Sequence, residues 1–172
     1  MKRTLSFILL AACSLLPMGA QAPMDGGVWN DNTGKHINAH GGSIFNYKGT
    51  YYWYGESRSA DGKPYSSLGV SCFTSKNLKD WTNHGLVLPV SDQPGSDIEG
   101  GCIIERPKVL YNARTKKFVM WFHLEMKGKG YAAARSGVAV SDTPFGPFRF
   151  VRSGRVNAGR YPIGFALADT TD

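Results

Sequence analysis

Short runs of apolar and aromatic residues alternate along the chain with glycine, asparagine, aspartate and proline, and few segments show the periodicity of an amphipathic helix. Runs of this length, rich in Tyr, Trp, Phe, Val and Ile and bounded by turn-forming residues, are typical of β-strands. The pattern of apolar and polar positions therefore predicts an all-β protein.

Two β-hairpins are predicted from this pattern. In the first, residues 43–47 and 50–56 are strand-like and flank Lys48-Gly49, which places a glycine where a tight two-residue hairpin turn requires one. In the second, residues 107–112 and 118–125 flank a longer turn. Both hairpins follow the same plan of strand, turn and strand.

The segments after the two hairpins also repeat. Each begins with a strand that opens on Gly-Val, at Gly69 and at Gly137, and continues into a turn that starts with serine and ends on an aromatic residue. A fourth strand is predicted at 84–89 in the first unit and at 153–156 in the second. The Gly-Val pairs are 68 residues apart, and the glycines of the fourth strands are 69 apart.

Four strands that recur at one long period are typical of the blades of a β-propeller, and a β-sandwich with two similar hairpins is the alternative. Propellers close with about four to eight blades, whereas this chain accommodates about two, and the stretch from Tyr161 to Asp172 does not complete a third hairpin. We therefore expect the chain to supply about two blades and the start of a third, as the N-terminal part of something longer.

The N-terminus is predicted to be a secretory signal peptide at residues 1–22. Lys2-Arg3 is followed by an apolar run that is too short for a membrane span and then by the A-x-A site at residues 20–22. Residues 23–172 are the predicted β-propeller part of the chain. Cys13 lies in a possible lipoprotein box, so lipid anchoring is the less favoured alternative to simple export to the periplasm, cell surface or medium.

Charge and cysteine content exclude some classes of function and leave others open. The formal net charge is +7, and removal of the signal peptide lowers it by two. The remaining basic residues are scattered, which favours a solvated surface and excludes a nucleic-acid partner. Cys72 and Cys102 lie in apolar runs and are interpreted either as two buried thiols or as a disulfide. No zinc-binding spacing occurs.

The most informative chemistry lies in the stretch GGCIIERPKVLYN, where Glu105 and Arg106 separate two apolar runs. A buried carboxylate is costly unless it has a partner or a function. In a propeller the start of each innermost strand points into the central channel, so Glu105 and His40 are predicted to occupy equivalent positions on adjacent blades. The alternative is that Glu105 and Arg106 form a structural pair at the blade junction.

The segments HINAHGGSIFNYKGTYYWYGE and ERPKVLYNARTKKFVMWFH, followed by GYAAARSGVAVSD, resemble glycoside hydrolase family 43. They are most similar to its exo-β-1,3-galactanase (galactan 1,3-β-galactosidase) branch, and the resemblance covers essentially all of residues 23–172. It implies a five-bladed β-propeller, an inverting mechanism and a polysaccharide or oligosaccharide of β-linked galactose as substrate.

The resemblance also implies how the catalytic groups are distributed. The wider family has an aspartate base on the first blade, where this chain reads Asn38-Ala39-His40. That departure agrees with the galactanase branch, in which a later glutamine is thought to act as the base. The second-blade carboxylate falls on Glu105, which would orient and tune the general acid. The acid and the base would both lie beyond Asp172, so the chain alone is expected to be inactive.

Further site residues are carried over from the resemblance. Glu56 is expected to bond sugar hydroxyls, and Tyr131 to lie near the galactose site. His40 is expected to hydrogen-bond a sugar hydroxyl, and Arg106 is expected to orient Glu105 as an adjacent cation. The alternatives are a solvated carboxylate for Glu56, a buried histidine for His40 and a core tyrosine for Tyr131. Trp53, Trp81 and Trp121 are predicted to be core residues.

The sequence thus predicts an exported, exo-acting glycoside hydrolase that releases galactose from β-1,3-galactan or arabinogalactan. The alternatives are an α-L-arabinofuranosidase or β-xylosidase of the same family, and a non-catalytic carbohydrate-binding protein. We expect a monomer without a membrane span, without a cofactor and without metal ligands among its residues, although propellers of this family often hold an ion in the channel.

Overall fold

The computed structural model describes residues 27–63 and 66–155, which form two four-stranded antiparallel sheets and one turn of 3-10 helix. Sheet 1 has the order β1-β2-β3-β4, and sheet 2 has the order β5-β6-β7-β8. The strands of sheet 1 are β1 (His40–Tyr47), β2 (Thr50–Arg58), β3 (Ser67–Ser75) and β4 (Thr82–Pro89). Those of sheet 2 are β5 (Ile103–Asn112), β6 (Lys117–Glu125), β7 (Arg135–Ser141) and β8 (Arg149–Gly154), with the 3-10 turn η1 (Tyr131–Ala133) between β6 and β7.

The two predicted hairpins are confirmed as β1–β2 and β5–β6. Lys48 and Gly49, with φ angles of 50° and 73°, form the first hairpin's turn. A turn of this kind matches the twist of the two strands, and glycine adopts positive φ without steric cost. The matched strand order of the two sheets agrees with two consecutive propeller blades.

The repeated turn that follows each third strand is also present. The backbone N–H of Asn77 donates to Ser75 Oγ at 3.1 Å, and that of Thr143 donates to Ser141 Oγ at 3.1 Å. The two serines are 66 residues apart in the sequence, slightly closer than the predicted period. Each turn leads to a buried aromatic side chain, Trp81 in sheet 1 and Phe148 in sheet 2.

The position of the last strand differs from the prediction. The strand predicted at 153–156 is β8, which begins at Arg149 and ends at Gly154. The prediction aligned Gly154 with Gly85, but Gly85 lies inside β4 at a φ of 73°, where the register with β3 shifts. Because Gly85 lies at a local irregularity of β4, Gly85 and Gly154 do not occupy equivalent strand positions, and aligning them misplaced the last strand.

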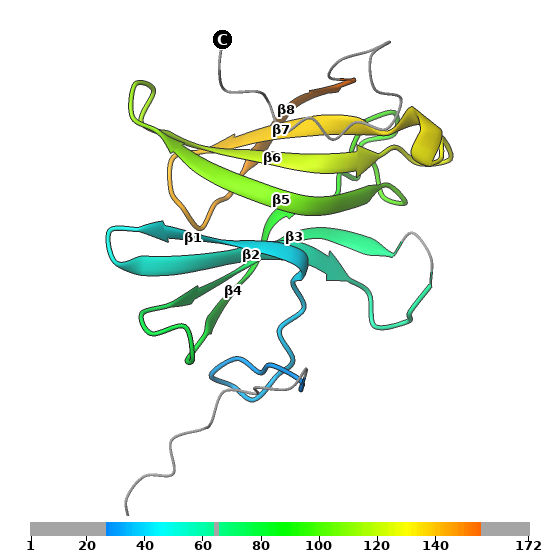
Figure 1. The fold of residues 1–172 in the computed structure, drawn as a ribbon. Coiled ribbons are helices and arrows are strands. Elements are labelled where there is room, and N and C mark those ends of the chain that lie inside the picture. Colours follow the sequence, from blue (N-terminus) through cyan, green and yellow to red (C-terminus); the bar gives the residue numbers. More distant parts are fainter. Residues whose placement is uncertain (1–26, 64–65, 156–172) are drawn as a thin grey trace, which may run out of the picture.

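The main core lies between the two sheets, which stack with β5 packed against β1, β2 and β3 (Figure 1). Tyr54 spans the interface, because its hydroxyl donates a hydrogen bond to the carbonyl of Pro144. The cluster contains sixteen buried residues: Tyr52, Tyr54, Val70, Cys72, Val87, Leu88, Ile98, Cys102, Ile104, Val109, Phe118, Met120, Phe122, Leu124, Ala139 and Phe148.

Both cysteines of this cluster carry buried free thiols, so the disulfide alternative is not realised in the structure. Burial raises the pKa of Cys72 to about 12 and that of Cys102 to about 11, because a thiolate is poorly solvated there. Neither thiol therefore has the character of a nucleophile at neutral pH.

A second core lies on the outer face of sheet 1, the face turned away from sheet 2. Residues 27–39 cross this face, and Ile37 and Ala39 are buried against Phe73 and Trp81. The Trp53 ring packs edge-on against Trp81 at 5.3 Å between ring centroids. The prediction that Trp81 is a core residue is thus confirmed, whereas Trp53 is half-buried and packs against this core.

The described residues leave much of the corresponding outer face of sheet 2 exposed, although His123 and Glu125 at one end of β6 are buried. Leu110 is 60% exposed and Trp121 is 43% exposed on this face. The prediction that Trp121 is a core residue is therefore wrong for the described part of the chain. Strand periodicity places its side chain on one face of β6, but only packing by another segment can bury that face.

Several predictions concern residues outside the described ranges. The signal peptide at residues 1–22, Cys13 and the start of a third blade after Arg160 all lie there. Within the described ranges, no helix is long and apolar enough to cross a membrane.

Candidate functional site

The innermost strands of the two sheets are interrupted at the same place. His40 of β1 lies opposite Glu56, and Glu105 of β5 lies opposite His123. Directly after His40 and directly after Glu105 the pairing shifts, which marks a β-bulge in each strand. The prediction that His40 and Glu105 occupy equivalent positions is confirmed by this shared register.

The first bulge residue of each strand has a similar positive φ angle, and the two bulges lie against each other. Gly41 has a φ of 54° and Arg106 has a φ of 51°. For a residue other than glycine, this left-handed conformation costs about 1–2 kcal/mol. Ser43 Oγ donates to the carbonyl oxygen of Pro107 at 2.6 Å, which joins one bulge to the other. Arg106 is therefore held in a strained conformation at the junction of the two sheets.

Glu56 is a buried carboxylate at the end of β2, 2% exposed. Arg58 Nε donates to Glu56 Oε2 at 2.7 Å, and Arg58 Nη2 lies 2.7 Å from the same oxygen. A buried ionised carboxylate requires such a partner, because desolvation alone would make it costly. The alternative of a solvated carboxylate for Glu56 is therefore wrong.

Glu105 lies between two guanidinium groups, one from each sheet. Arg58 Nη2 is 3.5 Å from Glu105 Oε1, and Arg106 Nη2 is 3.8 Å from Glu105 Oε2. The side chain of Glu105 remains 24% exposed. We call Glu56, Arg58, Glu105 and Arg106 the junction cluster. The structural alternative is realised as an ion-pair network at the blade junction, and the partial exposure of Glu105 leaves its role in a functional channel as a prediction.

Arg58 was not identified from the sequence, although it is the residue that links the two sheets in this cluster. The hydrogen bond from its side chain to Glu56 raises the pKa of Arg58 above its usual range, so the guanidinium stays charged. The pairing of Arg58 with Glu56 could have been predicted from the sequence, because residues two apart on a strand point to the same side of the sheet. Only the packing of the sheets shows that Arg58 also reaches Glu105.

A second group of side chains lies beside Glu105 along β6. His123, directly opposite Glu105, is buried, and its Nε2 is 3.3 Å from Glu125 Oε1. The ring of Tyr131, in η1, lies 5.4 Å from the His123 ring between centroids. Tyr131 is 45% exposed, so the alternative of a core tyrosine is wrong. His123 and Glu125 carried no sequence signal beyond their alternation on the strand.

His40 is exposed at the end of β1, so the alternative of a buried histidine is wrong as well. Glu56 lies opposite it on β2, and Arg58 connects Glu56 to Glu105. The structure thus gathers the five predicted site residues around the two bulges. Carboxylate oxygens that accept hydrogen bonds, guanidinium groups that donate them and an exposed aromatic ring are the groups that bind sugars through hydroxyls and ring faces.

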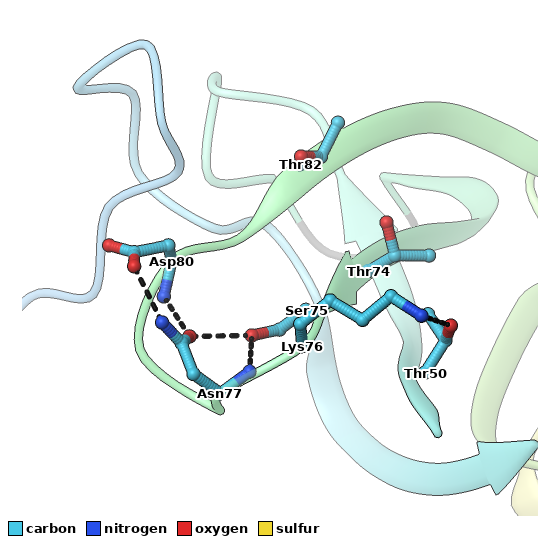
Figure 2. Close-up of a pocket in the computed structure, with 7 residues that line it drawn as sticks. All are labelled: Thr50, Thr74, Ser75, Lys76, Asn77, Asp80 and Thr82. Carbon is cyan, nitrogen blue, oxygen red and sulfur yellow. Dashed lines mark hydrogen bonds between the residues drawn. The ribbon is translucent and has the colours of Figure 1, made fainter. Parts of the chain in front are cut away.

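A hollow with a volume of about 280 Å³ lies elsewhere on the described part of the chain. Its lining residues come from the β3–β4 turn and the start of β2 (Figure 2). Glu56 lies near the other end of β2. Its polar groups already bond to one another: Lys76 Nζ donates to Thr50 Oγ1 at 2.6 Å, and Asn77 Nδ2 donates to Asp80 Oδ2 at 2.7 Å. We interpret this hollow as a surface feature of the turn.

No group of three or more His, Cys, Asp or Glu side chains within residues 27–63 and 66–155 is arranged to hold a metal ion. The expectations of no cofactor and of an ion in the channel both remain predictions.

No protein-family model matches the chain, and no curated protein sequence matches it either. Solved structures do match. A β-1,3-galactosidase of family GH43 with galactodeoxynojirimycin is 57% identical, with a TM-score of 0.73, over 77% of this chain and 38% of that protein. An exo-β-1,3-galactanase from Clostridium thermocellum is 44% identical, with a TM-score of 0.68, over 76% of this chain and 27% of that protein.

An exo-β-1,3-galactanase from Phanerochaete chrysosporium, solved with galactose, is 35% identical, with a TM-score of 0.67. That match covers 75% of this chain and 29% of the fungal protein. The chain therefore spans less than two fifths of the length of each of these three proteins.

Proposed function

Because the chain belongs to glycoside hydrolase family 43, we propose that it is part of an exported, exo-acting, inverting hydrolase that releases galactose from β-1,3-galactan or arabinogalactan. The observation that carries the proposal is the junction cluster, in which Glu105 is partly exposed between Arg58 and Arg106. This cluster belongs to a chain that is 57% identical to a β-1,3-galactosidase. We also propose that the full-length protein closes into a five-bladed propeller.

Glu105 is proposed to orient and tune the general acid and to anchor the sugar, and not to donate the proton itself. An inverting hydrolase places its acid and its base about 6.5–9.5 Å apart, so that a water molecule fits between the base and the sugar. With its two oxygens near two different guanidinium groups, Glu105 has a defined orientation from which it can hold a neighbouring acid in place. A misplaced acid slows proton transfer to the leaving oxygen.

The remaining site residues are proposed to bind the galactose unit. His40 is exposed opposite Glu56 and Arg106 is exposed beside Glu105, so both can donate hydrogen bonds to sugar hydroxyls, and buried Glu56 can accept one near its Arg58 partner. The exposed ring of Tyr131 offers an apolar face against which a sugar ring can pack. These hydrogen-bonding groups and the Tyr131 ring would together match the hydroxyls and the apolar face of a terminal galactose.

The test is the release of galactose from β-1,3-galactan by the full-length protein, with Glu105→Gln as the variant. We expect kcat to fall about a hundredfold or more, because the acid loses its orienting partner. Asp142→Asn is the matched control, because it removes one carboxylate charge at an exposed turn where Asp142 pairs with Lys117. Near-normal turnover in Glu105→Gln would remove Glu105 from the mechanism.

Substrate class is tested by comparing aryl β-galactoside, α-L-arabinofuranoside and β-xyloside side by side. Preference for the galactoside supports the proposal, whereas preference for either pentoside assigns the protein to the other activities of its family. Binding of galactan without any release of galactose by the full-length protein would instead indicate a carbohydrate-binding protein.

A further inference from the structure

The side chain of Asn38 forms a two-point contact with the backbone of Arg58. Asn38 Nδ2 donates to the Arg58 carbonyl oxygen at 2.7 Å, and Asn38 Oδ1 accepts from the Arg58 N–H at 3.0 Å. Of the side chains of this size, only an amide offers a donor and an acceptor side by side, in the arrangement of a neighbouring strand's peptide group. The amide group thus takes the place of a β-ladder partner.

Arg58 requires such a partner because the regular pairing of β2 ends there. On one side, the β1–β2 pairing reaches only to His40 and Glu56. On the other side, the β2–β3 register shifts between Ser57 and Arg58. The Asn38 amide bonds both backbone groups of Arg58 at this irregular position, where an unmade hydrogen bond would leave the residue poorly fixed.

Asn38 is itself held firmly in place. Its neighbours Ile37 and Ala39 are buried at 5% and 6% exposure on the outer face of sheet 1, and its own carbonyl oxygen accepts from Ser71 Oγ at 2.6 Å. The segment that covers sheet 1 therefore presents the amide from a fixed position. Arg58, in contrast, has a long side chain that is 47% exposed and depends on its backbone for direction.

We propose that Asn38 is a positioning residue that fixes Arg58 and thereby sets the Glu56–Arg58–Glu105 link between the two sheets. Its consequence for sugar binding rests on the function proposed above. On this proposal the amide of Asn38 is needed to hold Arg58, and a carboxylate at this position would not serve. An aspartate at this position would have no donor for the Arg58 carbonyl and would compete with Glu56 for the guanidinium group.

The first test follows the Arg58 Nε–H group, which donates to Glu56 at 2.7 Å, by NMR of full-length protein labelled with 15N-arginine. In Asn38→Asp we expect this proton to exchange with water about tenfold faster or more, because the guanidinium leaves Glu56. Asn46→Asp, on the exposed side of β1, adds the same charge as a matched control and should leave the resonance unchanged. An unchanged Arg58 resonance in a folded Asn38→Asp protein would overturn the proposal.

The second test is a double-mutant cycle of Asn38→Asp and Arg58→Lys, read out as the dissociation constant for β-1,3-galactobiose. If Asn38 acts through Arg58, Asn38→Asp weakens binding about tenfold in the parent and changes it little in the Arg58→Lys background. Equal effects in both backgrounds would contradict the proposal. Should Asn38→Asp fail to fold, Asn38→Ser replaces it in both tests, because serine keeps a donor without adding charge.

The two proposals can fail separately. A parent protein that binds neither galactose nor β-1,3-galactobiose would contradict the proposed function, while the Arg58 resonance would still decide the role of Asn38.

Discussion

The two sheets of this protein share one strand plan but differ in what lies on their outer faces. In sheet 1 the outer face is covered by residues 27–39 and contains buried Phe73 of β3 beside Trp81, whereas in sheet 2 it carries exposed Leu110 and Trp121. The same alternation of side chains along a strand therefore has opposite consequences in the two units. The difference teaches that strand pattern defines a face, while a neighbouring segment decides whether that face is core.

The ends of the innermost strands differ in a complementary way. Sheet 1 has His40 opposite Glu56, and sheet 2 has Glu105 opposite His123, so the acid and the histidine exchange strands. At the bulge, sheet 1 has a glycine and sheet 2 has Arg106 in the same left-handed conformation. In sheet 2 the strained backbone of Arg106 therefore accompanies a guanidinium group beside Glu105.

The largest expected effect tests the covered face. Trp81→Ala should lower the free energy of unfolding by about 3–5 kcal/mol, because a large ring that is 1% exposed would leave a cavity beneath residues 27–39. Trp121→Ala should cost less than about 1 kcal/mol. Urea titration of the protein measures both. An equally large cost for Trp121→Ala would mean that another part of the protein covers the outer face of sheet 2.

The next prediction concerns the close contact between Gly55 of β2 and residues 27–39, which cover the outer face of sheet 1. A Cβ atom on Gly55 would lie 2.3 Å from the carbonyl carbon of Ala39, so Gly55→Ala should destabilise the protein by about 3 kcal/mol. Gly154→Ala is the matched control in sheet 2, where an added Cβ meets nothing within 4 Å, and its effect should stay within about 0.5 kcal/mol. Similar melting temperatures for the two variants would contradict this account of the contact.

A smaller effect is expected at the two bulges. Arg106→Gly should change the stability by no more than about 1 kcal/mol, because relief of strain is offset by the greater freedom of glycine in the unfolded chain. The same substitution should weaken galactose binding about tenfold, since a charged donor is lost. Calorimetry measures both quantities. Gly41→Ala, the reverse change in sheet 1, should cost about 1 kcal/mol, and a stabilised Gly41→Ala would argue against strain at these positions.

The smallest effect is a pH dependence confined to the segment that covers sheet 1. The hydrogen bond from the Thr33 side chain lowers the pKa of Asp31 below its ordinary value of 3.8, with further bonds from the Thr33 and Lys35 backbone. A lowered folded-state pKa gives stability that is present above pH 3.8 and is lost as the pH falls through the folded value. Asp31→Asn should therefore destabilise the protein above pH 4, and the difference should shrink on acidification.

Urea midpoints at several pH values between 3 and 7 measure this dependence. Asp142→Asn serves as the control, because Asp142 is exposed and lies on sheet 2. A difference between the parent and Asp31→Asn that grows toward low pH would contradict the direction of the Asp31 shift.

Much of the fold and part of the site could be predicted from the sequence, because the signals were local. The glycine of the Lys48-Gly49 turn and the alternation of side chains located the hairpins, and the equivalence of His40 and Glu105 followed from the repeat. The last strand was misplaced because Gly85 marks a bulge. Arg58 and His123 were missed because their roles depend on partners that lie far away along the chain.

The sequence by itself determined the all-β class, the two four-strand repeats and the equivalence of His40 and Glu105, since turns and strand periodicity depend on neighbours a few residues away. Only the tertiary structure decided that Trp81 is buried while Trp121 is exposed, that Arg58 joins Glu56 to Glu105, and that the Asn38 amide holds Arg58. Burial and ion pairing depend on which surfaces meet across the fold, and that information is distributed over segments distant in the sequence.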